Sequence, residues 1–140
     1  MAIARGAGTE IIRTALIENT DNTTTTLIFG VQHHIYTVLS IIIFGKGIQA
    51  AGNFVEVMFQ GYDAKAGTTA QGVVIFNQPM NLNETFVWND KFSFNGHEPT
   101  DFAGPIDSIA KQDAIADQGS SVAQLLQIYT EHADDNFEVA

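Results

Sequence analysis

Four histidines are the residues with the widest chemical range in this sequence, since imidazole can ligate a metal or act as a general base. They are His33, His34, His97 and His132. His33 and His34 are adjacent, and adjacent residues on a strand point to opposite faces, so the two could not reach one ion without distortion. Spacing does not show whether the fold gathers the others. We therefore interpret the histidines as polar residues of loops and strand ends, and we expect no metal site.

Carboxylates form a second group of candidates. The stretch 131–138 is acidic, and oxygen ligands from such a loop suit calcium. Its acidic residues are Glu131, Asp134, Asp135 and Glu138. Their spacing is not that of the twelve-residue calcium loop, and no glycine lies at the turn, so we interpret 131–138 as a solvated hairpin end and leave open whether it binds a cation. Asp113 and Asp117 lie one helical turn apart, a spacing that is common on exposed helices.

Nucleophilic and phosphate-binding motifs are not recognisable. Ser120 and Ser121 have no base at a readable spacing. The segments 6–8 and 45–47 are far from a phosphate-binding loop. The chain has no cysteine, which excludes thiolate chemistry and disulfides. We therefore expect no catalytic residue, no cofactor and no enzyme activity.

Composition excludes further classes of protein. The chain has 140 residues, the length of one domain, and 45% of them are hydrophobic. A net charge of −10 would repel nucleic acid, so we expect no direct nucleic-acid binding. No apolar run is long enough to span a membrane. Charged residues make up only 16% of the chain, and this neutral surface favours a protein that assembles with partners.

The candidate side chains must be positioned by β structure, because Thr, Asn, Gly and Phe are abundant and short apolar segments alternate with turn signals. The patterns predict strands at 10–17, 24–29, 34–44, 53–62, 73–76, 84–95, 121–129 and 137–140. The run 34–44 is predicted to be central, and 84–95 to be a strand pair or one bent strand. Residues 18–22 and 131–136 are predicted turns, 63–72 a loop, and 105–117 a helix.

Seven or eight short strands with turns between them predict an all-β, single-domain antiparallel β-sandwich, jelly-roll or immunoglobulin-like, with one short helical insertion near 105–117. Residues 1–9 are predicted to be a flexible N-terminal arm, either a disordered tail or a segment that orders only on a neighbouring subunit. Residues 10–140 would form the sandwich domain, and 97–121 would be an insertion in it.

Aromatic residues recur at every second position around the turn between two predicted strand segments. They are Phe86, Trp88, Phe92 and Phe94. Such rings could stack on sugars if they were exposed, but packing in the core is the commoner role for this alternation. We therefore favour a core position for them.

Several segments together resemble a family of small virion structural proteins of tailed bacteriophages, especially marine ones. They are 1–13, 33–40, 84–92 and 118–124. The resemblance covers most of the chain and its motifs are structural. It implies a compact β-sandwich without enzyme activity, present in many copies in the virion.

The expected function is that of a capsid decoration or cement protein, which acts by self-association, for example as a trimer, and by binding other virion proteins such as the major capsid protein. The contact elements would be 1–9 and 97–121. The alternative is a tail or fibre component that binds host carbohydrate through exposed aromatics such as Trp88 or Tyr62. In the family a strand near the carboxyl end completes a sheet, whereas this sequence stops at Ala140. We expect either a short last strand or an open edge there.

Overall fold

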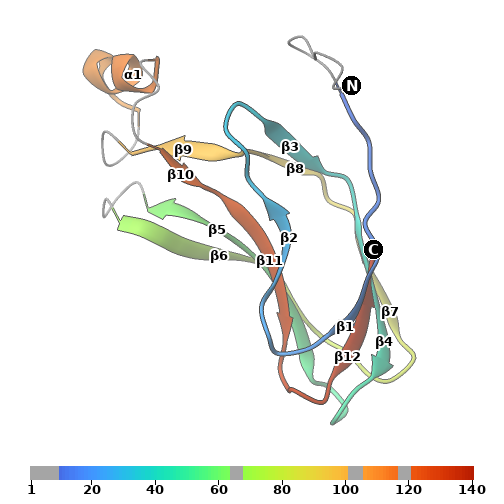
Figure 1. Cartoon of the computed structure of the whole chain (residues 1–140). Helices are drawn as coiled ribbons and strands as arrows, with labels where there is room; N and C mark the ends of the chain where they lie inside the picture. The colour runs from blue at the N-terminus through green and yellow to red at the C-terminus, as the bar shows by residue number, and fades with distance from the viewer. Residues whose placement is uncertain (1–9, 64–67, 101–105, 117–120) are drawn as a thin grey trace.

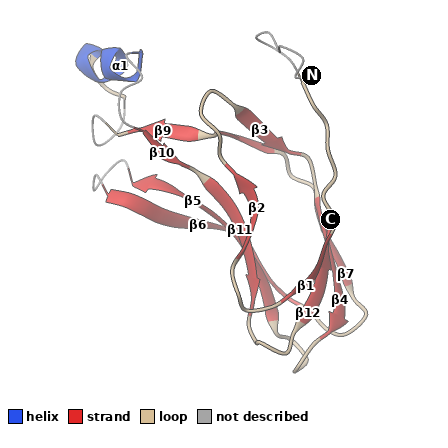
Figure 2. Cartoon of the chain, in the orientation of Figure 1, coloured by secondary structure: helices blue, strands red, loops and turns tan. Residues whose placement is uncertain are grey.

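The computed structural model describes residues 10–63, 68–100, 106–116 and 121–140, and these are mostly β structure (Figures 1 and 2). The one helix among them is α1 (Ile109–Ala116). The strands are β1 (Ile17–Thr20), β2 (Thr25–Phe29), β3 (Ile35–Val38), β4 (Ile41–Gly47), β5 (Phe54–Asp63), β6 (Thr68–Pro79), β7 (Thr85–Trp88), β8 (Phe92–Asn95), β9 (His97–Pro99), β10 (Ser121–Ala123), β11 (Leu125–Thr130) and β12 (Asn136–Val139). The predicted all-β class, with one short helix late in the chain, is confirmed.

Two four-stranded antiparallel sheets form the sandwich. The first sheet has the order β1-β12-β4-β7, and the second sheet has the order β2-β11-β5-β6. The pairing is nested, because β1 pairs with β12, β2 with β11, β4 with β7 and β5 with β6. This nested order is that of a jelly roll and differs from the ABED and CFG sheets of an immunoglobulin sandwich. The structure therefore selects the first of the two predicted architectures.

The two-stranded pairs lengthen this frame. Strand β3 pairs with β8 just beyond the point where β4 pairs with β7, so the two pairs follow one another along the same ribbon. The prediction of one central strand over 34–44 is therefore wrong in its continuity, because the run breaks at Leu39 and Ser40. The partner ribbon breaks at the same level, at residues 89–91, which include the turn-forming Asn89 and Asp90. The prediction of a bent strand or strand pair over 84–95 matches β7 and β8.

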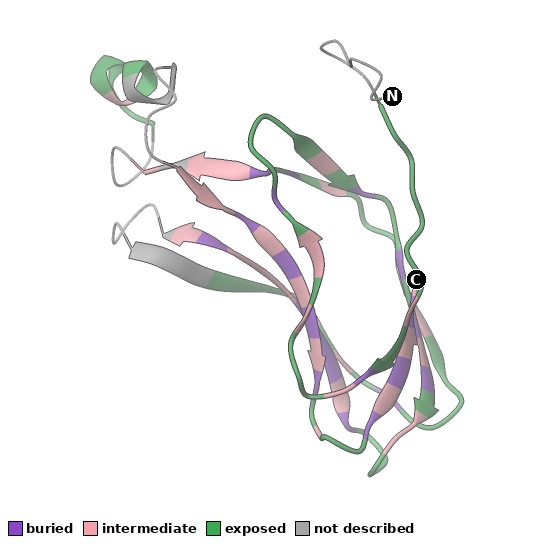
Figure 3. Ribbon diagram, in the orientation of Figure 1, coloured by how far each residue is buried: buried purple, intermediate pink, exposed green. Residues whose placement is uncertain are grey.

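The core lies between the inner faces of the two sheets (Figure 3). On β5 the predicted core face is confirmed, since Val55 and Val57 are fully buried and Phe59 packs against the core. Ile128 on β11 is also fully buried. The first sheet contributes Ile43 and Phe137, which have no exposed surface. Strand alternation thus identifies the buried face of β5 correctly. The expectation that 34–44 is covered on both faces is wrong, because Ile35 and Ile42 are exposed.

The predicted first strand is wrong over most of its length. The ladder with β12 begins only at Ile17, which pairs with Val139. Among the described residues, none offers 10–16 a backbone hydrogen bond, so β propensity alone does not make this segment a strand. The turn predicted at 18–22 is also displaced. Asn19 has a positive φ of 57° and lies where the β1 register shifts, so turn-forming residues make an irregularity within the strand.

The prediction of a loop over 63–72 is wrong for 68–72, which belong to β6 and pair with the end of β5. Residues with little to pack can still extend a strand when a long partner continues beside them. Strand β6 ends at Pro79 and lies at a sheet edge, as expected for proline. The predicted helix exists as α1 over part of 105–117. Residues 1–9, Pro105, Asp117 and Ser120 lie outside the described residues.

The last strand is not an open edge. Strand β12 lies between β1 and β4, and Ala140 continues the pairing through reciprocal backbone hydrogen bonds of 2.8 and 2.9 Å with Ile42. The expectation of an open edge at the last strand is therefore wrong. The turn predicted at 131–136 exists, but the prediction of a hairpin is wrong. Strand β11 lies in the second sheet and β12 in the first, so this turn crosses between the sheets rather than joining paired strands.

Candidate functional site

Three of the histidines line one open hollow of about 350 Å³, together with Asn95 and Ser121. His33 and His34 belong to a tight turn rather than a strand, because His33 has a φ of 65° and His34 N–H donates to the Val31 carbonyl at 3.2 Å. The premise that they point to opposite faces is therefore wrong. His97 comes from β9, across the sheet from the turn. In the parts of the chain that the structure describes, no three His, Cys, Asp or Glu side chains are grouped closely enough to hold a metal ion.

Within this hollow, His97 Nδ1 and Ser121 Oγ are 2.9 Å apart. The contact arises because β9 pairs with β10, with Ala123 opposite His97, so Ser121 is a diagonal neighbour. A serine nucleophile needs a base, a group that orients the base, and donors for the oxyanion. His97 has no carboxylate partner among the described residues. The pair therefore lacks the orienting group of a catalytic triad.

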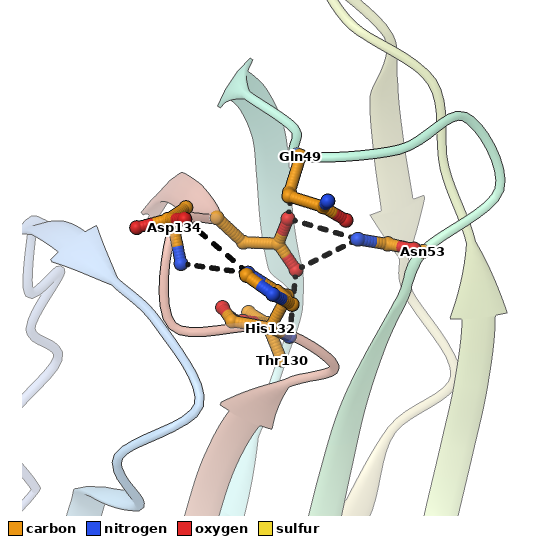
Figure 4. Close-up of polar contacts among 6 residues, drawn as sticks. Gln49, Asn53, Thr130, His132 and Asp134 are labelled. Carbon is orange, nitrogen blue, oxygen red and sulfur yellow. Dashed lines mark hydrogen bonds and ion pairs between the residues drawn. The ribbon is translucent and has the colours of Figure 1, made fainter.

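Asp135 is the most buried carboxylate of the acidic stretch 131–138, with 3% of its surface exposed, and it has a structural role. Its carboxylate accepts hydrogen bonds from Gln49 N–H at 2.9 Å, His132 N–H at 3.0 Å and the Asn53 amide at 3.1 Å (Figure 4). These donors tie the β11–β12 turn to the connection between β4 and β5. The Asp135 carboxylate oxygens therefore accept hydrogen bonds from N–H donors of the protein.

The other acidic side chains of 131–138 are also paired individually. Glu131 accepts a hydrogen bond from Phe54 N–H at 3.1 Å. Asp134 lies 3.7 Å from His132 Nδ1, and Glu138 lies 3.4 Å from Lys46 Nζ. The acidic residues that the sequence suggests as a calcium loop thus each have a separate protein partner.

The aromatic set packs as favoured by the sequence. Trp88 contacts Phe76 with ring centroids 6.1 Å apart, and Phe92 in an edge geometry at 5.4 Å. Phe94 is buried, and Phe86, Trp88 and Phe92 pack against the core. Trp88 is therefore half-buried among rings and does not present a flat exposed platform.

Three exposed aliphatic side chains lie close together in the segment 10–16, which we call the N-terminal segment. Ile12 and Leu16 are each 81% exposed, and Ile11 is 56% exposed. The segment leads directly into β1 and projects away from the end of the first sheet (Figures 1 and 3). Large aliphatic side chains at this exposure have apolar area to bury on association. This segment is therefore a candidate surface for association.

Comparison with family models, curated proteins and solved structures found no significant match to the chain. None of the described helices is long and apolar enough to cross a membrane.

Sequence reasoning missed two features of these surfaces. The hollow that joins His33, His34 and His97 depends on the turn at His33 and on the pairing of β9 with β10, and neither has a spacing signal. The N-terminal segment had a signal, namely apolar residues next to Arg13, but that pattern equally predicts a strand.

Proposed function

We propose that this chain is a non-enzymatic structural protein of a bacteriophage virion, acting as a capsid decoration or cement protein that associates with copies of itself and with the shell. The identification with a phage rests on the resemblance of 1–13, 33–40, 84–92 and 118–124 to that family. The jelly-roll order agrees with it, since this architecture recurs in viral capsid domains as well as in lectins.

The observation that carries the assembly role is the N-terminal segment. Ile12 and Leu16 stay in solvent although the chain around them is extended and adjoins a sheet. Segments of this kind gain stability by ordering on a neighbouring subunit, where apolar burial offsets the entropy of ordering. Repetition of such a contact over many copies would make a modest interface strong.

Immunogold electron microscopy of intact phage particles, with an antibody to this chain, tests the proposal. Label distributed over the head is the expected result. Label confined to the tail tip or fibres would contradict decoration and favour the carbohydrate-binding alternative, for which Trp88 offers no exposed ring. Absence of label would also contradict a surface decoration role.

The assembly role has a test on purified protein. We expect Leu16→Asp to weaken self-association in sedimentation velocity while leaving the melting temperature unchanged, because Leu16 is exposed in the monomer. Leu82→Asp is the matched control, since Leu82 is also exposed but lies between β6 and β7. Equal effects of the two variants would contradict a role of the N-terminal segment.

A further inference from the structure

Side chains on the outer face of the first sheet form rows that cross the strands. On β4, Ile41 and Ile43 are buried, whereas Ile42 is exposed and Phe44 half-buried on the opposite face. Val87 lies opposite Ile42 on β7, and Ala140 lies opposite it on the other side. An apolar row therefore crosses this face at the level of Ile42.

The next row, two residues along each strand, has acidic members. Glu138 lies opposite Phe44 on β12. Glu18 follows on the β1 side, where it is exposed and has no ion-pair partner among the described residues. The two rows border a groove of about 510 Å³ lined by Leu16, Glu18, Ile42, Phe44, Glu138 and Ala140, among others.

The N-terminal segment has the complementary pattern. In an extended chain Ile11 and Arg13 lie on the same side, about 6.7 Å apart, which is also the spacing of Ile42 and Phe44 along β4. Arg13 is exposed and has no ion-pair partner in the described part of the chain. A segment laid across the groove can therefore place Ile11 on the apolar row and Arg13 beside the carboxylates at the same time.

The described residues of the N-terminal segment do not fill this groove. Leu16 forms part of the groove wall, but residues 10–15 are exposed and run away from it. Ile11 would be covered if it occupied the groove, yet it is 56% exposed. The groove and the N-terminal segment are thus adjacent on one molecule, but the segment does not occupy the groove.

We propose that this groove binds the N-terminal segment of a second copy of the chain, with Ile11 on the apolar row and Arg13 paired with Glu18 and Glu138. Because segment and groove adjoin at Leu16, two copies can exchange segments reciprocally, as in a two-fold contact. The inference rests on the self-association in the proposed function and names the surfaces that make it.

Single cysteines test the contact directly, because the chain has none of its own. One variant carries Ile12→Cys, because residue 12 faces away from the groove when Ile11 and Arg13 of the bound segment face it. The other carries Thr85→Cys, which is exposed opposite Phe44 on β7. The two are given tags of different size, mixed, and treated with a short bis-maleimide. A product containing both chains can arise only between molecules, and we expect it in yield well above that obtained when Leu82→Cys replaces Thr85→Cys. Equal yields would overturn the inference.

Charge exchange provides a second readout. We expect Arg13→Glu to weaken self-association about twofold to fivefold beyond Lys91→Glu, which changes the net charge equally at an exposed site away from the groove. Glu18→Arg should weaken it similarly, and Arg13→Glu with Glu18→Arg in one chain should restore it.

The outcomes separate the two proposals. A wild-type chain that stays monomeric at all concentrations would contradict the proposed self-association itself. A wild-type chain that associates, without the specific crosslink and with Arg13→Glu equal to Lys91→Glu, would overturn only the assignment of the groove.

Discussion

Tyr129 lies directly opposite Glu56 on the neighbouring strand, and its phenol donates a hydrogen bond to the Glu56 carboxylate. The pair lies on the outer face of the second sheet, where Phe54 packs edge-on against Tyr129 with centroids 6.0 Å apart. Glu56 is buried although no cation contacts it among the described residues. A protonated tyrosine is thus the donor that satisfies this carboxylate.

The hydrogen bond to Glu56, followed by burial and the carboxylate charge, raises the pKa of Tyr129 above its usual 10.0. The difference in alkaline absorbance titration between wild type and Tyr129→Phe should therefore give a midpoint above 10. In Glu56→Gln that midpoint should fall towards the usual value. The contribution of this group to stability is complete below the unfolded pKa and is lost as pH rises through the raised folded pKa. An unchanged midpoint in Glu56→Gln would contradict the assignment.

Among the acidic residues of the stretch 131–138, Asp135 should contribute most to the free energy of unfolding. Asp135→Ala leaves the buried Asn53 amide and the part-buried N–H groups of Gln49 and His132 without their acceptor, and we expect the free energy of unfolding to fall by about 3 kcal/mol. Urea denaturation measures this change. Asp134→Ala, whose side chain is exposed, is the control and should change stability by less than about 0.5 kcal/mol. A similar effect of both variants would show that the network is not important for stability.

Gly96 should tolerate no side chain. Its N–H donates to the His34 carbonyl and its own carbonyl accepts from Gln124 N–H, both at 2.8 Å. A Cβ at this position would lie 1.9 Å from the backbone oxygen of Val31, which a side-chain rotation cannot relieve. We expect Gly96→Ala to lower the free energy of unfolding by more than about 3 kcal/mol. Gly47→Ala is the control, because its Cβ would make an ordinary contact of 3.4 Å, and a comparable loss there would contradict the steric argument.

Salt should strengthen self-association. Each copy carries a net charge of −10, so two copies repel each other over distances set by the Debye length. That length falls from roughly 30 Å at 0.01 M salt to about 8 Å at 0.15 M. Sedimentation velocity should therefore show larger species as sodium chloride is raised over this range. A decrease would mean that attraction between opposite charges outweighs the repulsion between whole subunits.

The sequence predicts those features that depend on alternation within one strand. The burial of Val55 and Val57 and the packing of Trp88 both follow from which residues share a face. Alternation says nothing about partners, so it could not choose the jelly-roll order over the immunoglobulin order. It also assigned 10–16 to a strand, because a strand needs a neighbour that propensity does not supply.

The candidate surfaces were less predictable for the same reason. His97 and Ser121 are separated in sequence and meet only through the pairing of β9 with β10. The groove combines Leu16, which directly precedes β1, with Ile42 of β4 and Glu138 of β12, and the nested pairing brings these strands side by side. Both the His97–Ser121 contact and the groove depend on pairing between strands that are distant in the sequence. No local sequence pattern indicates such pairing.

The nested pairing also sets the order of events during synthesis. Ile17 pairs with Val139, so β1 has its partner only after nearly all the described chain has left the ribosome. Topologies dominated by such distant contacts fold slowly, because loop closure precedes the gain from pairing. The groove wall at Leu16 therefore forms among the last elements. A nascent chain whose β12 has not yet emerged could not capture the segment of a neighbour on the same polysome, and the binding surface would mature only after β1 and β12 have paired.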